Sequence, residues 1–199
     1  METIVSNSTQ NIGRLMSKEK KTAVAKTLFI PIIMSVLMGV VSVPSAANSL
    51  KIGDIAPDFS VKTINGKSVN LSDFTYKKPV YLKFWATWCA YCKVEMPHLQ
   101  AIYDANGTEI KVLTVNVAMN DSIANINKFY RKNGFDLPTV FDQSGALTSS
   151  YGVIGTPYHV LINKQGRIAY RTFLATDELD ERIALLSKES STATVSKPK

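Results

Sequence analysis

The residues best suited to chemistry are Cys89 and Cys92, the only two cysteines in the 199-residue chain. They follow an apolar run typical of a β-strand, and a helical pattern begins where they occur. Cys89 is therefore expected at a helix N-terminus, where free N–H groups and the helix dipole favour a thiolate. Cys92 lies one turn along, near enough to close a disulfide. The pair predicts reversible dithiol–disulfide chemistry, with Cys89 as the nucleophile and Cys92 as the resolving thiol.

The elements around this pair predict one α/β domain over residues 50–187. Apolar and alternating runs predict strands, with a hairpin turn at Asn65-Gly66, and 3.6-residue spacing predicts helices. The order implies a mixed central sheet flanked by helices and preceded by a β-hairpin. The Ser/Thr/Lys-rich residues 188–199 are predicted to be a disordered tail. The strands are expected at 60–64, 67–70, 79–85, 109–117, 139–141, 158–162 and 167–173, and the helices at 89–104, 122–133, 146–151 and 177–186.

Residues 1–47 have the features of an export leader. Five basic residues precede an apolar run at 28–43, and small residues at 45–47 are typical of a signal-peptidase site. Because the run is shorter than the about 20 residues that span a bilayer, a cleaved signal peptide is favoured over an uncleaved membrane anchor. Both alternatives place the dithiol in the periplasm or at the exterior of the cell envelope, where disulfides persist.

The net charge argues against nucleic acid as a partner. The formal charge of +7 falls to +4 for residues 48–199, and these charges are spread along the chain without basic clusters.

Four segments together resemble the thioredoxin superfamily, and within it the exported TlpA/ResA-like and CcmG-like thiol-disulfide oxidoreductases. The resemblance extends from Ile55 to about Leu186. The segments are Ala-Pro-Asp-Phe at 56–59, Trp-Ala-Thr-Trp-Cys-Ala-Tyr-Cys at 85–92, Glu-Met-Pro at 95–97 and Gly-Val-Ile-Gly-Thr-Pro at 152–157.

The resemblance assigns further roles around the dithiol. It implies a cis proline at Pro157 and a backbone at Thr156 that binds an extended segment of the substrate. It also implies that Glu95, three residues after Cys92, is partly buried and exchanges a proton with that thiol. Trp88 is expected to shield the disulfide at the surface, whereas Trp85 is expected to pack in the core.

Two positions depart from the family pattern and are expected to tune the dithiol. Thioredoxins have a buried Asp where this chain has Lys83, and the family commonly has Pro where this chain has Tyr91. Lys83 either pairs with Glu95 or packs its stem while its ammonium group reaches water; the second alternative is slightly favoured.

A non-enzymatic copper carrier is the main alternative function, because His98 and His159 are also present. Thioredoxin-fold copper chaperones space their cysteines by three residues, however, and here the spacing is two. His98 is expected to be solvated and His159 to face away from the sulfurs, so no metal site is predicted. A peroxiredoxin is disfavoured because Thr87 lies two residues before Cys89, where that family needs three.

The combined expectation is an exported thiol:disulfide oxidoreductase that reduces disulfides of specific envelope proteins. The resemblance suggests a role in cytochrome c maturation or another envelope thiol-reducing pathway, with a membrane thiol-reducing electron donor. No haem, flavin or nucleotide signature is present, so no cofactor is expected. A monomer is expected, and an isomerase is disfavoured because no extra dimerisation segment is present.

Overall fold

A computed structural model describes residues 50–195, which form a five-stranded sheet, a separate two-stranded hairpin, four α-helices and one short 3₁₀ helix. The predicted leader at 1–47 lies outside the described residues. None of the helices in the described part is long and apolar enough to cross a membrane.

The sheet is mixed, as the sequence predicts. Its strands lie in the order β5-β4-β3-β6-β7, with β3 parallel to β4 and antiparallel to β6. All six residues of β3 are buried because the strand is central and covered on both faces, which explains its nearly continuous apolar sequence. The strands are β3 (Val80–Trp85), β4 (Lys111–Asn116), β5 (Thr139–Phe141), β6 (Tyr158–Ile162) and β7 (Ile168–Thr172).

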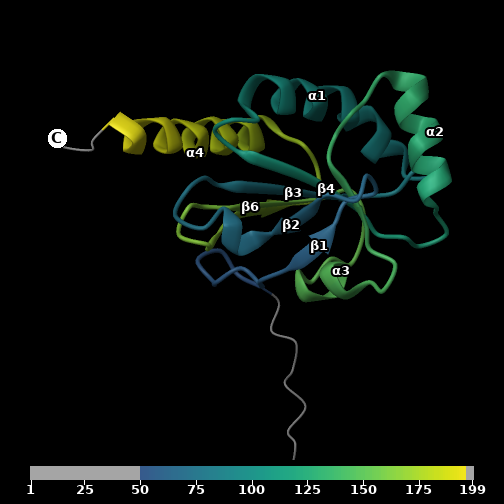
Figure 1. Cartoon of the computed structure of the whole chain (residues 1–199), viewed down its shortest axis with the longest axis horizontal. Coiled ribbons are helices and arrows are strands. Elements are labelled where there is room, and N and C mark those ends of the chain that lie inside the picture. The colour runs from purple at the N-terminus through teal and green to yellow at the C-terminus, as the bar shows by residue number, and fades with distance from the viewer. Residues whose placement is uncertain (1–49, 196–199) are drawn as a thin grey trace, which may run out of the picture. The chain divides into compact units, whose positions relative to one another are not determined.

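Different elements cover the two faces of the sheet (Figure 1). Helices α1 (Ala90–Asn106), α2 (Ile123–Asn133) and α4 (Asp177–Val195) cover one face. The hairpin of β1 (Ser60–Lys62) and β2 (Ser68–Asn70), the 3₁₀ helix η1 (Leu71–Asp73) and α3 (Ala146–Ser150) cover the other. The predicted fold class, with its N-terminal hairpin, is confirmed.

The end of α4 corrects one prediction. The sequence predicts a helix that ends at Leu186 and a disordered tail from residue 188, but α4 continues to Val195. Residues 187–195 contain neither Gly nor Pro, and extending an existing helix costs far less than starting one. Residues 188–195 are therefore helical, while residues 196–199 lie outside the described part.

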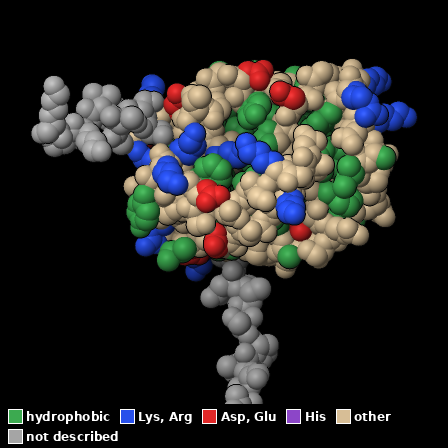
Figure 2. Space-filling view, viewed as in Figure 1, with side chains coloured by type: hydrophobic (Ala, Val, Ile, Leu, Met, Phe, Trp, Pro, Cys, Tyr) green, Lys and Arg blue, Asp and Glu red, His purple; other side chains and the backbone are tan. Residues whose placement is uncertain are grey.

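On the face shown in Figure 2, basic and acidic side chains are interspersed among polar and apolar ones.

Candidate active site

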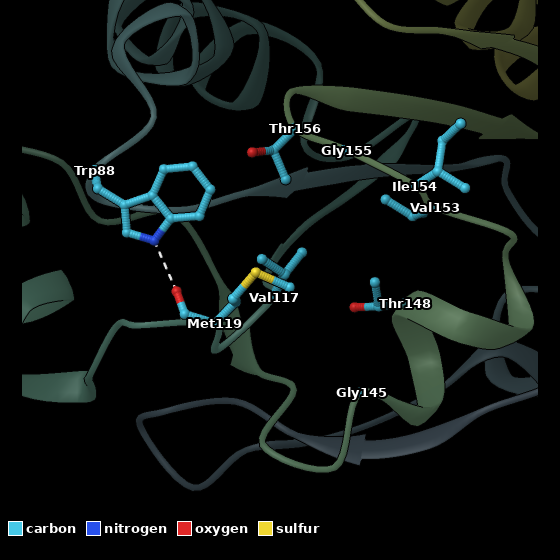
Figure 3. A pocket seen from close by; sticks show the side chains of 9 residues that line it. All are labelled: Trp88, Val117, Met119, Gly145, Thr148, Val153, Ile154, Gly155 and Thr156. Carbon is cyan, nitrogen blue, oxygen red and sulfur yellow. Dashed lines mark hydrogen bonds between the residues drawn. The ribbon is translucent and has the colours of Figure 1, made fainter.

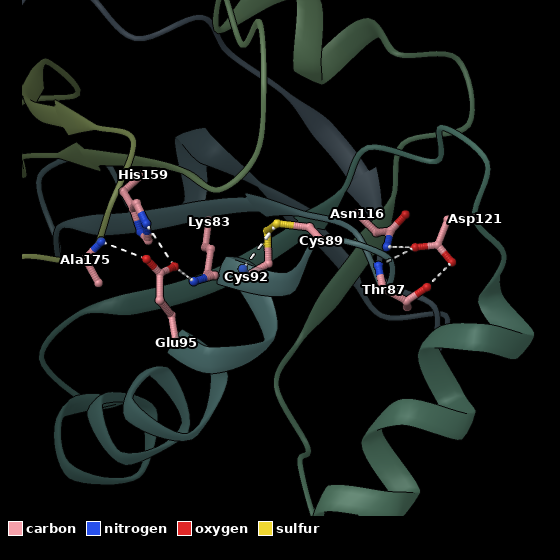
Figure 4. Close-up of a disulfide and its surroundings, with 9 residues drawn as sticks. All are labelled: Lys83, Thr87, Cys89, Cys92, Glu95, Asn116, Asp121, His159 and Ala175. Atoms are coloured by element: carbon pink, nitrogen blue, oxygen red, sulfur yellow. Dashed lines mark hydrogen bonds and ion pairs between the residues drawn. A yellow bond between two sulfur atoms is a disulfide. The ribbon is translucent and has the colours of Figure 1, made fainter.

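The two cysteines lie at the junction of β3 and α1, joined as a disulfide with their Cα atoms 5.2 Å apart (Figure 4). Cys89 is the N-cap of α1, and its Sγ accepts a hydrogen bond from the Cys92 backbone N–H at 3.2 Å. Cys89 is 6% exposed and Cys92 is fully buried. A thiol or disulfide arriving from solvent therefore meets Cys89 first.

Asp121, which the sequence reasoning missed, fixes the turn before Cys89. Its carboxylate accepts hydrogen bonds from the Thr87 backbone N–H and hydroxyl, both at 2.7 Å, and from Asn116 Nδ2 at 2.8 Å (Figure 4). Burial alone would raise the pKa of Asp121, but the hydrogen bonds from Thr87, Asn116 and the Ser122 N–H lower it. The ionised carboxylate thus ties the active-site turn to the loop before α2.

Trp88, which directly precedes Cys89 in the chain, borders an apolar cleft of about 300 Å³. Its indole N–H donates to the Met119 carbonyl at 2.7 Å, while half of the residue remains exposed (Figure 3). Thr156 lies at another side of the cleft, and apolar side chains including Val117, Val153 and Ile154 line the space between. Tyr91, the other expected tuning residue, is 70% exposed.

The loop before β6 brings Thr156 and Pro157 to this region. The Thr156–Pro157 peptide is cis, as the resemblance implies. Within residues 50–195 the Thr156 hydroxyl is buried and has no hydrogen-bond partner. The structure therefore brings the Cys89–Cys92 turn, Trp88 and this loop to one end of the sheet.

Lys83 corrects the favoured sequence interpretation. Its side chain is buried and its ammonium group is paired with Glu95 Oε2, so the head does not reach water (Figure 4). The other carboxylate oxygen, Oε1, accepts the Ala175 N–H at 2.9 Å. The pairing arises because Lys83 sits on β3 directly beneath α1, where an ammonium group needs a buried partner.

His159 joins the same cluster, which the sequence reasoning did not anticipate. It lies directly opposite Lys83 in the register of β3 against β6, and it is fully buried. Its Nε2 lies 3.3 Å from Glu95 Oε2, without a well-aligned hydrogen bond. Its Nδ1 lies 2.7 Å from the Tyr81 hydroxyl. The only sequence signal was a histidine inside an otherwise apolar strand.

The charges in this cluster are set by burial and by each other. Burial alone would raise the pKa of Glu95, but His159, the Ala175 N–H and Lys83 outweigh it and lower the pKa to about 2. Burial lowers the pKa of Lys83, partly offset by Glu95, and burial likewise lowers the pKa of His159. Glu95 is therefore a carboxylate at neutral pH and His159 a neutral imidazole. A proton exchange between Glu95 and Cys92 stays a prediction.

His98 lies apart from this cluster, half exposed on α1, with Nε2 2.9 Å from the Asp180 carboxylate on α4. The described residues contain no group of three or more His, Cys, Asp or Glu side chains placed to hold a metal ion.

A mixed sheet with a Cys-x-x-Cys pair at a helix N-terminus, beside a cis proline, defines a thioredoxin-fold dithiol protein. The chain belongs to the AhpC/TSA family, which matches residues 52–171. Thiol-disulfide oxidoreductase ResA of Bacillus cereus is 34% identical over 152 residues, which cover 72% of this chain and 85% of that protein. Sporulation thiol-disulfide oxidoreductase A of Bacillus subtilis is 33% identical over 112 residues, covering 55% of this chain and 67% of that protein.

A solved structure shows the same likeness. The exposed lipoprotein thioredoxin Etrx1 of Streptococcus pneumoniae is 33% identical with a TM-score of 0.56, covering 67% of this chain and 99% of that one. The resemblance to ResA-like proteins is thus confirmed, and the chain is a thiol-disulfide oxidoreductase.

Proposed function

We propose that this chain is an exported reductant of disulfides in specific proteins of the cell envelope. The observation that carries the proposal is the asymmetric pair at the start of α1, where Cys89 at the N-cap keeps 6% of its surface exposed and Cys92 is fully buried. Its similarity to a lipoprotein thioredoxin described as exposed and the leader-like residues 1–47 support export to the periplasm or envelope exterior.

The reaction is two thiol–disulfide exchanges. The Cys89 thiolate attacks a disulfide of the partner protein, forming a mixed disulfide and releasing one partner sulfur, which takes up a proton. The Cys92 thiolate then attacks Cys89 Sγ, which re-forms the Cys89–Cys92 disulfide and releases the second partner sulfur. A membrane thiol-reducing donor returns two electrons to this chain, which acts as a monomer and needs no bound cofactor.

The cleft that Trp88 borders is where we place the substrate. An extended segment of the partner pairs with the backbone of Thr156, next to Pro157, and contacts the exposed face of Trp88. The cleft is apolar, and the unpartnered Thr156 hydroxyl offers one hydrogen bond. We propose cysteine-containing envelope proteins, such as apocytochromes c awaiting haem attachment, as the substrate class.

Substitution of each cysteine tests the mechanism. Purified reduced protein should reduce insulin disulfides, and Cys89→Ser should abolish this activity. Cys92→Ser should instead accumulate mixed disulfides with envelope proteins, seen as thiol-sensitive high-mass bands. The double variant is the matched control and should trap nothing. If Cys92→Ser traps no partner in cells, the proposed exchange is wrong.

The equilibrium potential of the couple tests the direction of electron flow. Because the proposed protein is a reductant, titration of the Cys89–Cys92 pair against glutathione should give a potential well below that of the glutathione couple. Each tenfold change in the exchange equilibrium corresponds to about 30 mV. A potential above the glutathione couple would make the protein an oxidant and overturn the reductant assignment.

A further inference from the structure

We propose that Lys83 is a positioning residue for the resolving step: its ammonium group neutralises Glu95, so that Cys92 ionises beside a neutral pair and not beside a lone buried carboxylate. The inference rests on the proposed function, because it concerns the step in which Cys92 attacks the mixed disulfide. It also replaces the expected proton exchange at Glu95 with an electrostatic role for the pair.

The positions of three side chains place this pair at Cys92. Glu95 lies three residues after Cys92, so both project from the same face of α1. Tyr81, Lys83 and Trp85 are every second residue along β3, so their side chains share one face of the sheet. Tyr81, Trp85 and Cys92 pack in one buried cluster. Figure 4 shows the Lys83 side chain reaching Glu95 to one side of Cys92.

The charge of Lys83 matters because little solvent reaches the pair: the Lys83 side chain is 1% exposed and the Glu95 side chain 13% exposed. A carboxylate close to Cys92 opposes its ionisation, and a like charge in a buried site shifts a pKa by a unit or more. The contacts that hold Glu95 ionised would make that opposition permanent at neutral pH. The Lys83 ammonium group supplies the opposite charge on the sheet side of the carboxylate and cancels it.

The neighbouring groups leave Lys83 as the compensating cation. From β6, His159 faces Glu95 and is neutral. From β3, Tyr81 is a neutral phenol whose pKa burial raises well above 10. From α4, Asp180 is paired with His98 of α1 at the surface. In the described part of the chain, Lys83 is therefore the only cation paired with the Glu95 carboxylate.

The resolving step balances without a proton on Glu95. Cys92 S–H loses its proton and its sulfur attacks Cys89 Sγ, which breaks the bond between Cys89 and the partner sulfur. The proton is taken up by the departing partner thiolate, and Lys83 stays protonated throughout. Glu95 remains a carboxylate, so neither residue of the pair changes its charge.

A two-phase release of thionitrobenzoate isolates this step. Reduced protein is mixed with Ellman's reagent: attack by Cys89 releases one thionitrobenzoate, and attack by Cys92 on the adduct releases the second. Both rates are followed from pH 5 to 9 by stopped flow. Lys83→Met should slow the second phase at neutral pH about tenfold or more, because a one-unit rise in the Cys92 pKa removes nine-tenths of its thiolate. The first phase is the internal reference for Cys89.

Glu95→Gln separates the two possible roles of the carboxylate. If Lys83 compensates Glu95, removing the negative charge should leave the second phase as fast or faster and shift its pH profile to lower pH. A second phase slowed tenfold by Glu95→Gln would show that Glu95 itself accepts the proton, and would overturn the proposal. This outcome can be read even if Lys83→Met fails to fold.

The double variant Lys83→Met/Glu95→Gln completes the cycle. Its second-phase rate should return to within about threefold of that of the unsubstituted protein. If the two substitutions acted independently, the rate changes of the single variants would multiply, and charge compensation would be contradicted. Lys93→Met removes an exposed cation from the same helix and should change neither phase. If the unsubstituted protein released only one thionitrobenzoate, the proposed function would fail, whatever the role of Lys83.

Discussion

At the residue scale, one carboxylate links two loops that are far apart in the sequence. Asp121 accepts hydrogen bonds from Thr87 and Asn116, and also from the Ser122 N–H at 2.8 Å. Thr87 immediately precedes Trp88 and Cys89, so this carboxylate determines where the reactive sulfur sits at the helix N-terminus. The same residue thus serves the packing of the loops and the geometry of the dithiol.

Removal of the Asp121 carboxylate should lower the stability of the fold. Asp121→Ala leaves the Thr87 N–H and the Asn116 amide without acceptors, so we expect the free energy of unfolding to fall by about 2–3 kcal/mol. Urea denaturation of the oxidised protein measures this loss. Asp121→Asn keeps one acceptor oxygen and should lose less, and Glu181→Ala, at an exposed position, is the control. Equal stability of Asp121→Ala and the control would contradict the assigned role.

At the element scale, α2 shows how local signals set the ends of a helix. The Ser122 hydroxyl caps its start by accepting the Asn125 N–H at 3.1 Å. Gly134 ends it in the left-handed region at φ 72°, with its N–H donating to the Tyr130 carbonyl. Both signals are local in the sequence, which is why this helix was predicted with the correct end at residue 133.

A residue with a side chain at position 134 should therefore destabilise the end of α2, because the left-handed backbone conformation there is strained for it. A Cβ at this position meets no other atom within 4 Å, so crowding does not contribute. We expect Gly134→Ala to lower the free energy of unfolding by about 1 kcal/mol, since an L-residue is strained in this region. Gly134→Asn, which tolerates the left-handed region better, should lose clearly less. Thermal and urea unfolding compare the two variants, and an Asn variant as unstable as Ala would contradict this explanation.

What the sequence could not reveal is contact between elements. Cys89, Cys92 and the strand that precedes them form a contiguous signal, so the dithiol and its helix were predictable. The position of His159 opposite Lys83 depends on the register of β3 against β6, which no local pattern determines. Asp121 looks like an ordinary loop residue until the fold brings its loop beside Thr87.

At the scale of the whole molecule, the two faces of the sheet have different chemistry. The face covered by β1, β2 and α3 is packed with apolar side chains, whereas the face under α1 also buries the Lys83–Glu95–His159 cluster. Buried ionisable groups link folding to pH, because the unfolded chain binds protons that the folded chain resists. Acid is thus expected to lower the free energy of unfolding through the ionisable groups on the α1 side of the sheet.

The stability of the oxidised protein should fall in two stages as the pH is lowered. His159 has a pKa below 6.5 in the folded chain, so the unfolded chain binds more protons once the pH drops below about 6.5, and the free energy of unfolding decreases there. Glu95 has a folded pKa of about 2 against about 4.3 when unfolded. Its contribution is complete above the unfolded value and is lost as the pH falls from about 4.5 towards 2.

Urea unfolding at pH 7.5, 5.5 and 3.5 tests both stages on one protein. His159→Gln removes the imidazole and should flatten the change between pH 7.5 and 5.5. Because His159 also helps to lower the pKa of Glu95, this variant should reduce the loss at lower pH without abolishing it. Glu95→Gln should retain the first stage and weaken the second, because an amide has no proton to bind over this range. A first stage that persists undiminished in His159→Gln would assign the upper transition to another group, since burial of a neutral imidazole is the property that makes this stage depend on residue 159.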